Sequence, residues 1–204
     1  MASAPPTIMS AQAEDSGVIA DILADAFQQD PCMNWAVPLP AIYRDFYRFL
    51  ATSLYLPNGL VFMDDQQRAA AMWLPPGADH RVPVGARQLS LVLRLVLKRG
   101  PGVLSRLNQA QAVMEQHHPR EPHYYLHAIG ARRSQQGRGL GSALLKHMTQ
   151  TLDAERVPAY LESSSPQNLS LYQRHGFEVT GEAPLGPGGP TLHFMWREPR
   201  ETGV

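Results

Sequence analysis

Residues 136–141 read Gln136-Gly137-Arg138-Gly139-Leu140-Gly141, and they join a predicted strand, 123–131, to a predicted helix, 139–155. Glycine lets the backbone approach a ligand closely. The first turn of a helix has unpaired N–H groups, and the helix dipole favours negative charge there. Positive charge beside the loop comes from Arg132, Arg133 and Arg138. The stretch therefore predicts an anion site, and a pyrophosphate is the simplest ligand.

Two better-known phosphate loops do not fit this stretch. The dinucleotide-binding fingerprint places its third glycine three residues after the second, whereas Gly141 follows Gly139 by only two positions. The phosphate-loop NTPase signature requires Gly-Lys followed by Ser or Thr, and residues 136–142 lack it. Taken by itself, the loop leaves a plain structural turn as the alternative.

Strands and helices alternate on both sides of the loop. Apolar periodicity and turn residues predict strands at 7–12, 60–63, 69–74, 123–131, 159–163, 177–182 and 191–196. The same reasoning predicts helices at about 18–30, 41–56, 86–98, 103–117, 139–155 and 168–175. This alternation indicates an α/β layered domain. We expect one domain over residues 1–204, with a helical insertion at about 86–118.

Composition excludes several classes of protein. The chain has 204 residues, 44% hydrophobic and 18% charged, which is typical of a globular domain. Eighteen basic and eighteen acidic residues give no net charge, whereas nucleic-acid-binding proteins usually carry a basic excess. Residues 1–10 lack the features of a secretory signal, and no apolar run is long enough to span a bilayer. We therefore expect a cytoplasmic protein without nucleic-acid or membrane partners.

A second motif follows about thirty residues downstream. Within 159–177, Asn168 is followed by Leu171-Tyr172 and then by Gly176-Phe177. Together with Gln136-x-x-Gly139-x-Gly141, this order and spacing resembles the two signatures of the GCN5-related N-acetyltransferase (GNAT) superfamily. The resemblance is firm over residues 122–197 and loose over 7–75. Three stretches, 118–122, 135–143 and 161–168, make the chain most similar to the puromycin N-acetyltransferase group.

The resemblance implies a fold and a co-substrate. The fold is a single GNAT-type α/β (α+β) domain, with a mixed, curved sheet of six or seven strands and helices on both faces. The co-substrate is acetyl-CoA, and no metal is implied. In this family the fourth strand pairs with the pantetheine arm, and the loop N–H groups hold the pyrophosphate. The implied cofactor-binding residues are Ala128, Ile129, Gly130, Gln136, Gly137, Arg138, Gly139, Leu140, Gly141, Ser142 and Asn168.

The resemblance also implies a catalytic tyrosine. Tyr172 matches the family's general acid, which protonates the thiolate as the C–S bond breaks; a phenol held close to the sulfur can do this. A tyrosine that only packs the helix on the sheet is the alternative. The base is open between Glu162, where some relatives carry a catalytic glutamate, and His127, which lies on the strand beside the cofactor. Both also have a purely structural interpretation.

These features predict direct acetyl transfer to an amine of a small molecule. An acetyltransferase that acts on a protein N-terminus or lysine is the first alternative, and a non-catalytic CoA-binding sensor is the second. A homodimer that pairs through the strand at 191–196 also stays open.

Overall fold

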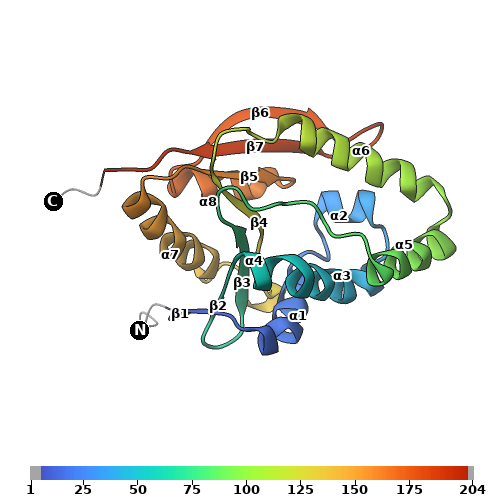
Figure 1. Ribbon diagram of the computed structural model, residues 1–204, viewed down its shortest axis with the longest axis horizontal. Coiled ribbons are helices and arrows are strands. Elements are labelled where there is room, and N and C mark those ends of the chain that lie inside the picture. The colour runs from blue at the N-terminus through green and yellow to red at the C-terminus, as the bar shows by residue number, and fades with distance from the viewer. Residues whose placement is uncertain (1–5, 202–204) are drawn as a thin grey trace.

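A seven-stranded sheet crosses the molecule in the order β1-β2-β3-β4-β5-β7-β6 (Figure 1). The computed structural model describes residues 6–201. The strands are β1 (Ile8–Ser10), β2 (Leu60–Asp64), β3 (Ala69–Leu74), β4 (Tyr124–Ala131), β5 (Ala159–Ser163), β6 (Glu178–Pro184) and β7 (Thr191–Arg197). β4 and β5 are parallel, and the other neighbouring pairs are antiparallel. The predicted mixed sheet of the α/β class is confirmed.

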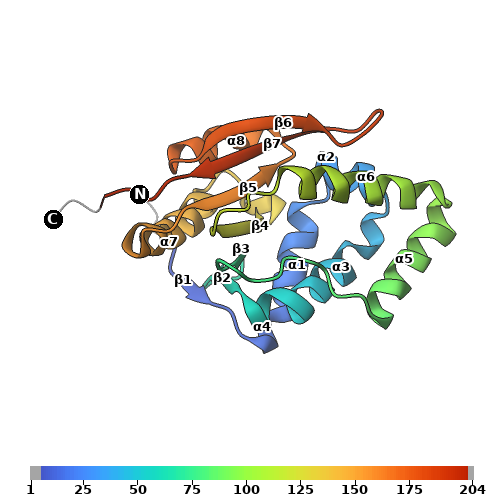
Figure 2. The same cartoon turned by 45° about the horizontal axis from the view of Figure 1, so that its top comes forward.

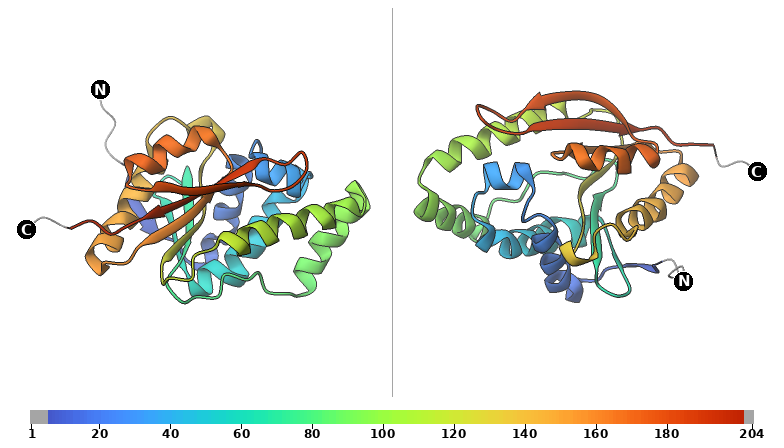
Figure 3. Two further views of the ribbon diagram at one scale, coloured as in Figure 1. Left: turned by 90° about the horizontal axis from the view of Figure 1, so that it is seen from above. Right: turned by 180° about the vertical axis from the view of Figure 1, so that it is seen from behind.

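Helices cover both faces of this sheet. They are α1 (Ser16–Ala26), α2 (Pro31–Ala36), α3 (Tyr43–Leu50), α4 (Leu56–Asn58), α5 (Ala86–Arg99), α6 (Gly102–His117), α7 (Leu140–Glu155) and α8 (Pro166–Arg174). Figure 2 shows α7 and α8 on one side of the sheet and α1 and α3 on the other. The hairpin of α5 and α6 projects from the body of the molecule (Figure 3). Within residues 6–201, no helix is both long and apolar enough to cross a bilayer.

Side-chain alternation along the strands divides the interior into two cores. Successive residues of a strand point to opposite faces. Accordingly, Met72 belongs to the core under α1 and α3, whereas Ala71 and Trp73 belong to the core under α7. The near-continuous apolar sequence of β3 follows from this arrangement, because both of its faces are buried.

β4 contains one residue more than its partner at the centre of the sheet. Met72 pairs with Ala128 and Trp73 pairs with Leu126, so His127 is the extra residue of a β-bulge. Pairing between β4 and β5 covers only residues 124–126 and 159–161. Beyond that point β4 continues to Ala131 paired with β3 alone. The two central strands therefore splay apart, and one backbone edge of β4 is open.

Two helices of the first half differ from their predicted bounds. α1 ends at Ala26 rather than near residue 30, and Asp30-Pro31 begins α2 instead of ending α1. The Asp30 carboxylate accepts a hydrogen bond from the Met33 N–H at 2.7 Å, and proline suits the first helical position. The single helix predicted for 41–56 is interrupted by a π-helical segment, Ala51–Tyr55.

Candidate active site

The glycine loop adopts a conformation that favours glycine at two positions. Gly137 and Gly139 have φ angles of 74° and 77°, in the left-handed region. A Cβ at either position would have no heavy atom within 4 Å, so their requirement is one of backbone conformation. At Gly141 space is tight instead, because a Cβ there would lie 3.3 Å from Leu171 Cδ2 on α8, and that side chain would have to shift slightly. The loop thus presents an exposed backbone surface at the N-terminus of α7.

Three other residues of the predicted cofactor loop pack against, or hydrogen-bond to, other parts of the protein. Leu140 is buried in the core under α7. The Ser142 hydroxyl lies 2.6 Å from His175 Nε2, which links the first turn of α7 to the end of α8. Gln136 Nε2 donates to the Ala131 carbonyl at 3.4 Å. Arg138 is exposed.

An aspartate that the sequence analysis did not single out fixes the start of this loop. Asp25, near the end of α1, accepts hydrogen bonds from the N–H of Arg133 at 2.7 Å and from its Nε at 3.1 Å. Arg132 Nε donates to the Gln67 carbonyl at 3.0 Å. Two of the three loop arginines are therefore held by protein groups, which leaves Arg138 and the α7 dipole to face an anion.

A small cavity lies where β4 and β5 splay. It is lined by Phe27, Asp30, Leu126, His127, Ala128, Ile129, Leu161, Glu162, Ser163, Ser164, Asn168 and Tyr172. The structure thus brings together all three predicted catalytic residues, the β4 edge at 128–129 and Asn168. We call this space the catalytic cavity.

Gly130 and the glycine loop do not line this cavity. Gly130 instead faces α1, because a Cβ there would lie only 2.5 Å from the Cβ of Ala26. The structure therefore gives this predicted cofactor contact a separate packing role.

Glu162 occupies a buried position with two phenol donors. Tyr125 Oη donates to its Oε2 at 2.8 Å, and Tyr160 Oη donates to its Oε1 at 3.2 Å. Burial raises the pKa of this carboxyl above its ordinary value, and the two hydrogen bonds and nearby His117 only partly oppose that shift. A carboxylate in this setting is a stronger base than an exposed one, and it attracts a cation.

His127 fits the role of base less well. Its ring stacks on Tyr55 with centroids 5.0 Å apart. Burial lowers the pKa of His127 to about 4, so the ring is neutral at pH 7 and a weak proton acceptor. The bulge places its Nδ1 3.5 Å from Tyr125 Oη. Between the two predicted bases, the electrostatics favours Glu162.

Tyr172 is the phenol of this cavity and is 7% exposed. Its ring packs edge-on against Phe177, with centroids 6.2 Å apart. Burial raises the pKa of Tyr172 above its ordinary value, and the charge of Asp30 adds to the effect. The phenol therefore stays protonated at neutral pH, as a proton donor must.

Asp30 is a site residue that the sequence analysis missed. It caps α2, and its second carboxylate oxygen accepts a hydrogen bond from Ser164 Oγ on the segment between β5 and α8. Burial raises the pKa of Asp30. The Asp-Pro pair is the signal that could have found it, since that pair begins helices as well as ending them.

Adjacent histidines at 117–118 have separate neighbours. His117 stacks on Phe194, and His118 stacks on His80, each with centroids 4.2 Å apart. Over residues 6–201 no group of three or more metal-ligating side chains is arranged to hold an ion. The absence of a metal remains a prediction.

The comparisons with known proteins agree with this geometry. Residues 102–177 match a family model described as the acetyltransferase (GNAT) family. This part of the chain, from α6 to the start of β6, is therefore similar to GNAT acetyltransferases. The open edge of β4 and the glycine loop before α7 both lie within the matched residues.

Solved structures share the GNAT fold over nearly the whole chain. A Corynebacterium glutamicum protein described as "histone acetyltransferase HPA2 and related acetyltransferase" is 24% identical, with a TM-score of 0.68 over 98% of this chain and 100% of that one. The Drosophila melanogaster polyamine N-acetyltransferase is 15% identical, with a TM-score of 0.65 over 94% and 99%. Arylalkylamine N-acetyltransferase 2 from Aedes aegypti is 12% identical, with a TM-score of 0.60 over 95% and 99%.

Proposed function

We propose that this protein transfers an acetyl group from acetyl-CoA directly to the amine of a small molecule. One observation carries the proposal. A single cavity joins the open edge of β4, Asn168, Tyr172 and the buried carboxylate of Glu162, and the glycine loop follows at the end of the same strand.

The residues present fit acetyl-CoA as co-substrate. An extended arm can add to the free edge of β4 at Ala128 and Ile129 as a further strand. The exposed loop 137–139 and the first turn of α7 supply N–H groups for a pyrophosphate. A backbone N–H near Ile129 is suited to polarise the thioester carbonyl.

An ammonium nitrogen loses two protons in becoming an amide N–H, and the leaving thiolate gains one. Glu162 takes the first proton, directly or through water, so that the neutral amine can attack the thioester carbon. As the C–S bond breaks, Tyr172 donates a proton to the sulfur, and the second proton of the nitrogen, which leaves as the amide forms, restores the phenol or passes to water. Burial suits both roles, because it raises both pKa values and so strengthens the carboxylate as a base and keeps the phenol protonated.

Direct transfer is favoured over an acetyl-cysteine intermediate. Cys32 is the sole cysteine of the chain. Burial raises the pKa of its thiol to about 12, and the charges of Asp30 and Glu162 add to the effect. The nucleophilic thiolate is therefore scarce at neutral pH.

The turn between β6 and β7, α2 and α6 are packed closely together, and closed packing of this kind suits a small acceptor better than a protein segment. The turn between β6 and β7 lies on α2 and α6, because a Cβ at Gly186 would meet Gln109 Oε1 at 2.1 Å and one at Gly189 would meet Trp35 Cε2 at 2.9 Å. Arg106 Nη1 of α6 donates to the Trp35 carbonyl at 3.0 Å, which ties α6 to α2.

The test is thiol release from acetyl-CoA with a panel of amines. The panel contains puromycin, because of the resemblance to that group, together with spermidine, 2-phenylethylamine, an aminoglycoside and a short peptide. Release that depends on one small amine, and that falls in Tyr172→Phe, is the expected result. Tyr124→Phe is the matched control, since Tyr124 faces α7 and bonds Glu155 at 2.6 Å.

Two other results would redirect the proposal. Preferred turnover of the peptide would favour a protein acetyltransferase. Tight CoA binding with no release for any amine would favour a sensor.

A further inference from the structure

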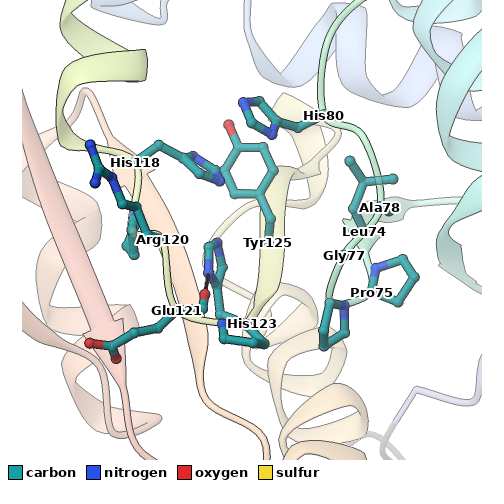
Figure 4. Close-up of a pocket in the computed structure, with 13 residues that line it drawn as sticks. Leu74, Pro75, Gly77, Ala78, His80, His118, Arg120, Glu121, His123 and Tyr125 are labelled. Carbon is teal, nitrogen blue, oxygen red and sulfur yellow. Dashed lines mark hydrogen bonds between the residues drawn. The ribbon is translucent and has the colours of Figure 1, made fainter.

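A larger cavity lies at the other end of β4 from the glycine loop (Figure 4). Its volume is about 390 Å³, within the range of small-molecule sites. One wall is the segment 74–80 that follows β3, and the other is the segment 118–123 that precedes β4. Tyr125 forms the inner wall. We call this space the histidine cavity, because His80, His118 and His123 line it.

Tyr125 separates the histidine cavity from the catalytic cavity. Its ring lines the first, while its hydroxyl donates to Glu162, which lines the second, at 2.8 Å. The same hydroxyl lies 3.5 Å from His127 Nδ1. A molecule in the histidine cavity is therefore one side chain away from the proposed base.

The walls of this cavity carry several flat aromatic rings. His118 stacks on His80 and approaches Tyr125 and Tyr160 edge-on, with centroids 5.1 Å and 5.2 Å away. Burial lowers the pKa of His118 to about 4 and also lowers that of His123.

The charges of this region have a simple pattern. Arg120 and Glu121 are exposed at the rim and carry opposite charges. Glu162, behind Tyr125, is the buried carboxyl nearest the inner end. This pattern suits one cation placed deep beside an apolar or flat body. Glu121 at the rim is the carboxyl among the residues that line the histidine cavity, and Asp30 lines the catalytic cavity instead.

We propose that the histidine cavity binds the acceptor, and that this acceptor is a monoamine with an aromatic or apolar body. The inference rests on the proposed function and names its substrate class. The body lies between the segments 74–80 and 118–123, each of which contributes histidine and proline rings, and the ammonium replaces the Tyr125 hydroxyl at Glu162. An ammonium–carboxylate hydrogen bond is stronger than the phenol bond it displaces. The Tyr125 and Tyr160 rings, 6.0 Å apart, add cation–π attraction.

Filling the cavity tests this assignment. Ala78→Trp places a large ring in the histidine cavity, and Val84→Trp places the same ring on the surface, since Val84 is 82% exposed. We expect the wild type to use 2-phenylethylamine with a kcat/KM about tenfold or more above that for spermidine. We expect Ala78→Trp to raise the KM for 2-phenylethylamine about tenfold or more, with the KM for acetyl-CoA within about twofold. Val84→Trp should match the wild type.

A binding measurement separates failure of this inference from failure of the proposed function. Calorimetry of 2-phenylethylamine with the CoA-loaded protein needs no catalysis. Binding that Ala78→Trp abolishes, without thiol release in the wild type, would refute the proposed function and the acceptor role, and would leave the histidine cavity as an amine-binding site. An unchanged KM and affinity in Ala78→Trp, or a preference for spermidine, would overturn the site. If Ala78→Trp does not fold, His118→Ala takes its place, because it removes the stacked wall and should weaken binding several-fold.

Discussion

Gly130 lies where α1 crosses β4 with no room for a side chain. A Cβ there would lie 2.5 Å from Ala26 Cβ, 3.5 Å from Phe27 Cε2 and 3.6 Å from Leu23 Cδ2. Non-bonded carbons pack best at about 3.5–4.0 Å. Gly130→Ala must therefore push α1 away from β4 by roughly 1 Å, because both contacting atoms at the closest approach are fixed to backbone. Overpacking of this kind costs about 1–3 kcal/mol.

Urea unfolding followed by circular dichroism measures this cost. We expect Gly130→Ala to lower the free energy of unfolding by about 1–3 kcal/mol. Gly102→Ala is the matched control, because Gly102 begins α6 and a Cβ there meets no atom within 4 Å. It should be neutral or stabilising by up to about 1 kcal/mol. Equal unfolding midpoints for Gly130→Ala and the wild type would refute the close contact of α1 with β4. A displaced α1 also moves Phe27, so turnover should fall as well.

Three further changes test the catalytic cavity. Tyr172→Phe should lower kcat about 10²–10⁴-fold and leave CoA affinity nearly unchanged; a kcat equal to that of Tyr124→Phe would contradict the acid role. Glu162 must be ionised to act as a base. The kcat/KM for the amine should therefore rise as the pH rises through the pKa of Glu162, which burial holds above its ordinary value. That acid limb should disappear in Glu162→Gln, and an identical limb in the variant would contradict the base role. Asp30→Ala removes the α2 cap and should cost about 0.5–2 kcal/mol in urea unfolding, whereas Asp30→Asn, which keeps a capping oxygen, should cost less.

Local patterns predicted the sheet and the loop well. The seven strands, the long helices α5–α7 and the glycine loop each depend on residues close together in sequence, where periodicity and turn chemistry act. The family resemblance supplied Tyr172, Glu162 and Asn168, which the structure places around one cavity. Their catalytic and binding roles remain predictions.

Features that depend on distant pairing were not predictable in this way. No residue pattern within β4 indicates the bulge at His127, because a bulge is defined by how β4 pairs with β3. Asp30 was interpreted as the end of one helix, and only the three-dimensional structure brings it to Ser164. The histidine cavity combines segments 74–80 and 118–123, which about forty residues of helical insertion separate in the chain. Local sequence patterns cannot predict contacts between residues so far apart in the chain.

The proposed cofactor edge of β4 lies directly after the bulge, where β4 has one residue more than β3 and its pairing with β5 has ended. Because an added strand would bond to backbone groups, most side-chain substitutions at 128–131 leave that edge in place. The loss of one residue at the bulge would instead shift the register of the rest of β4 by one position and turn its side chains to the opposite face. In this region, the length of the strand matters more to function than the identity of its side chains.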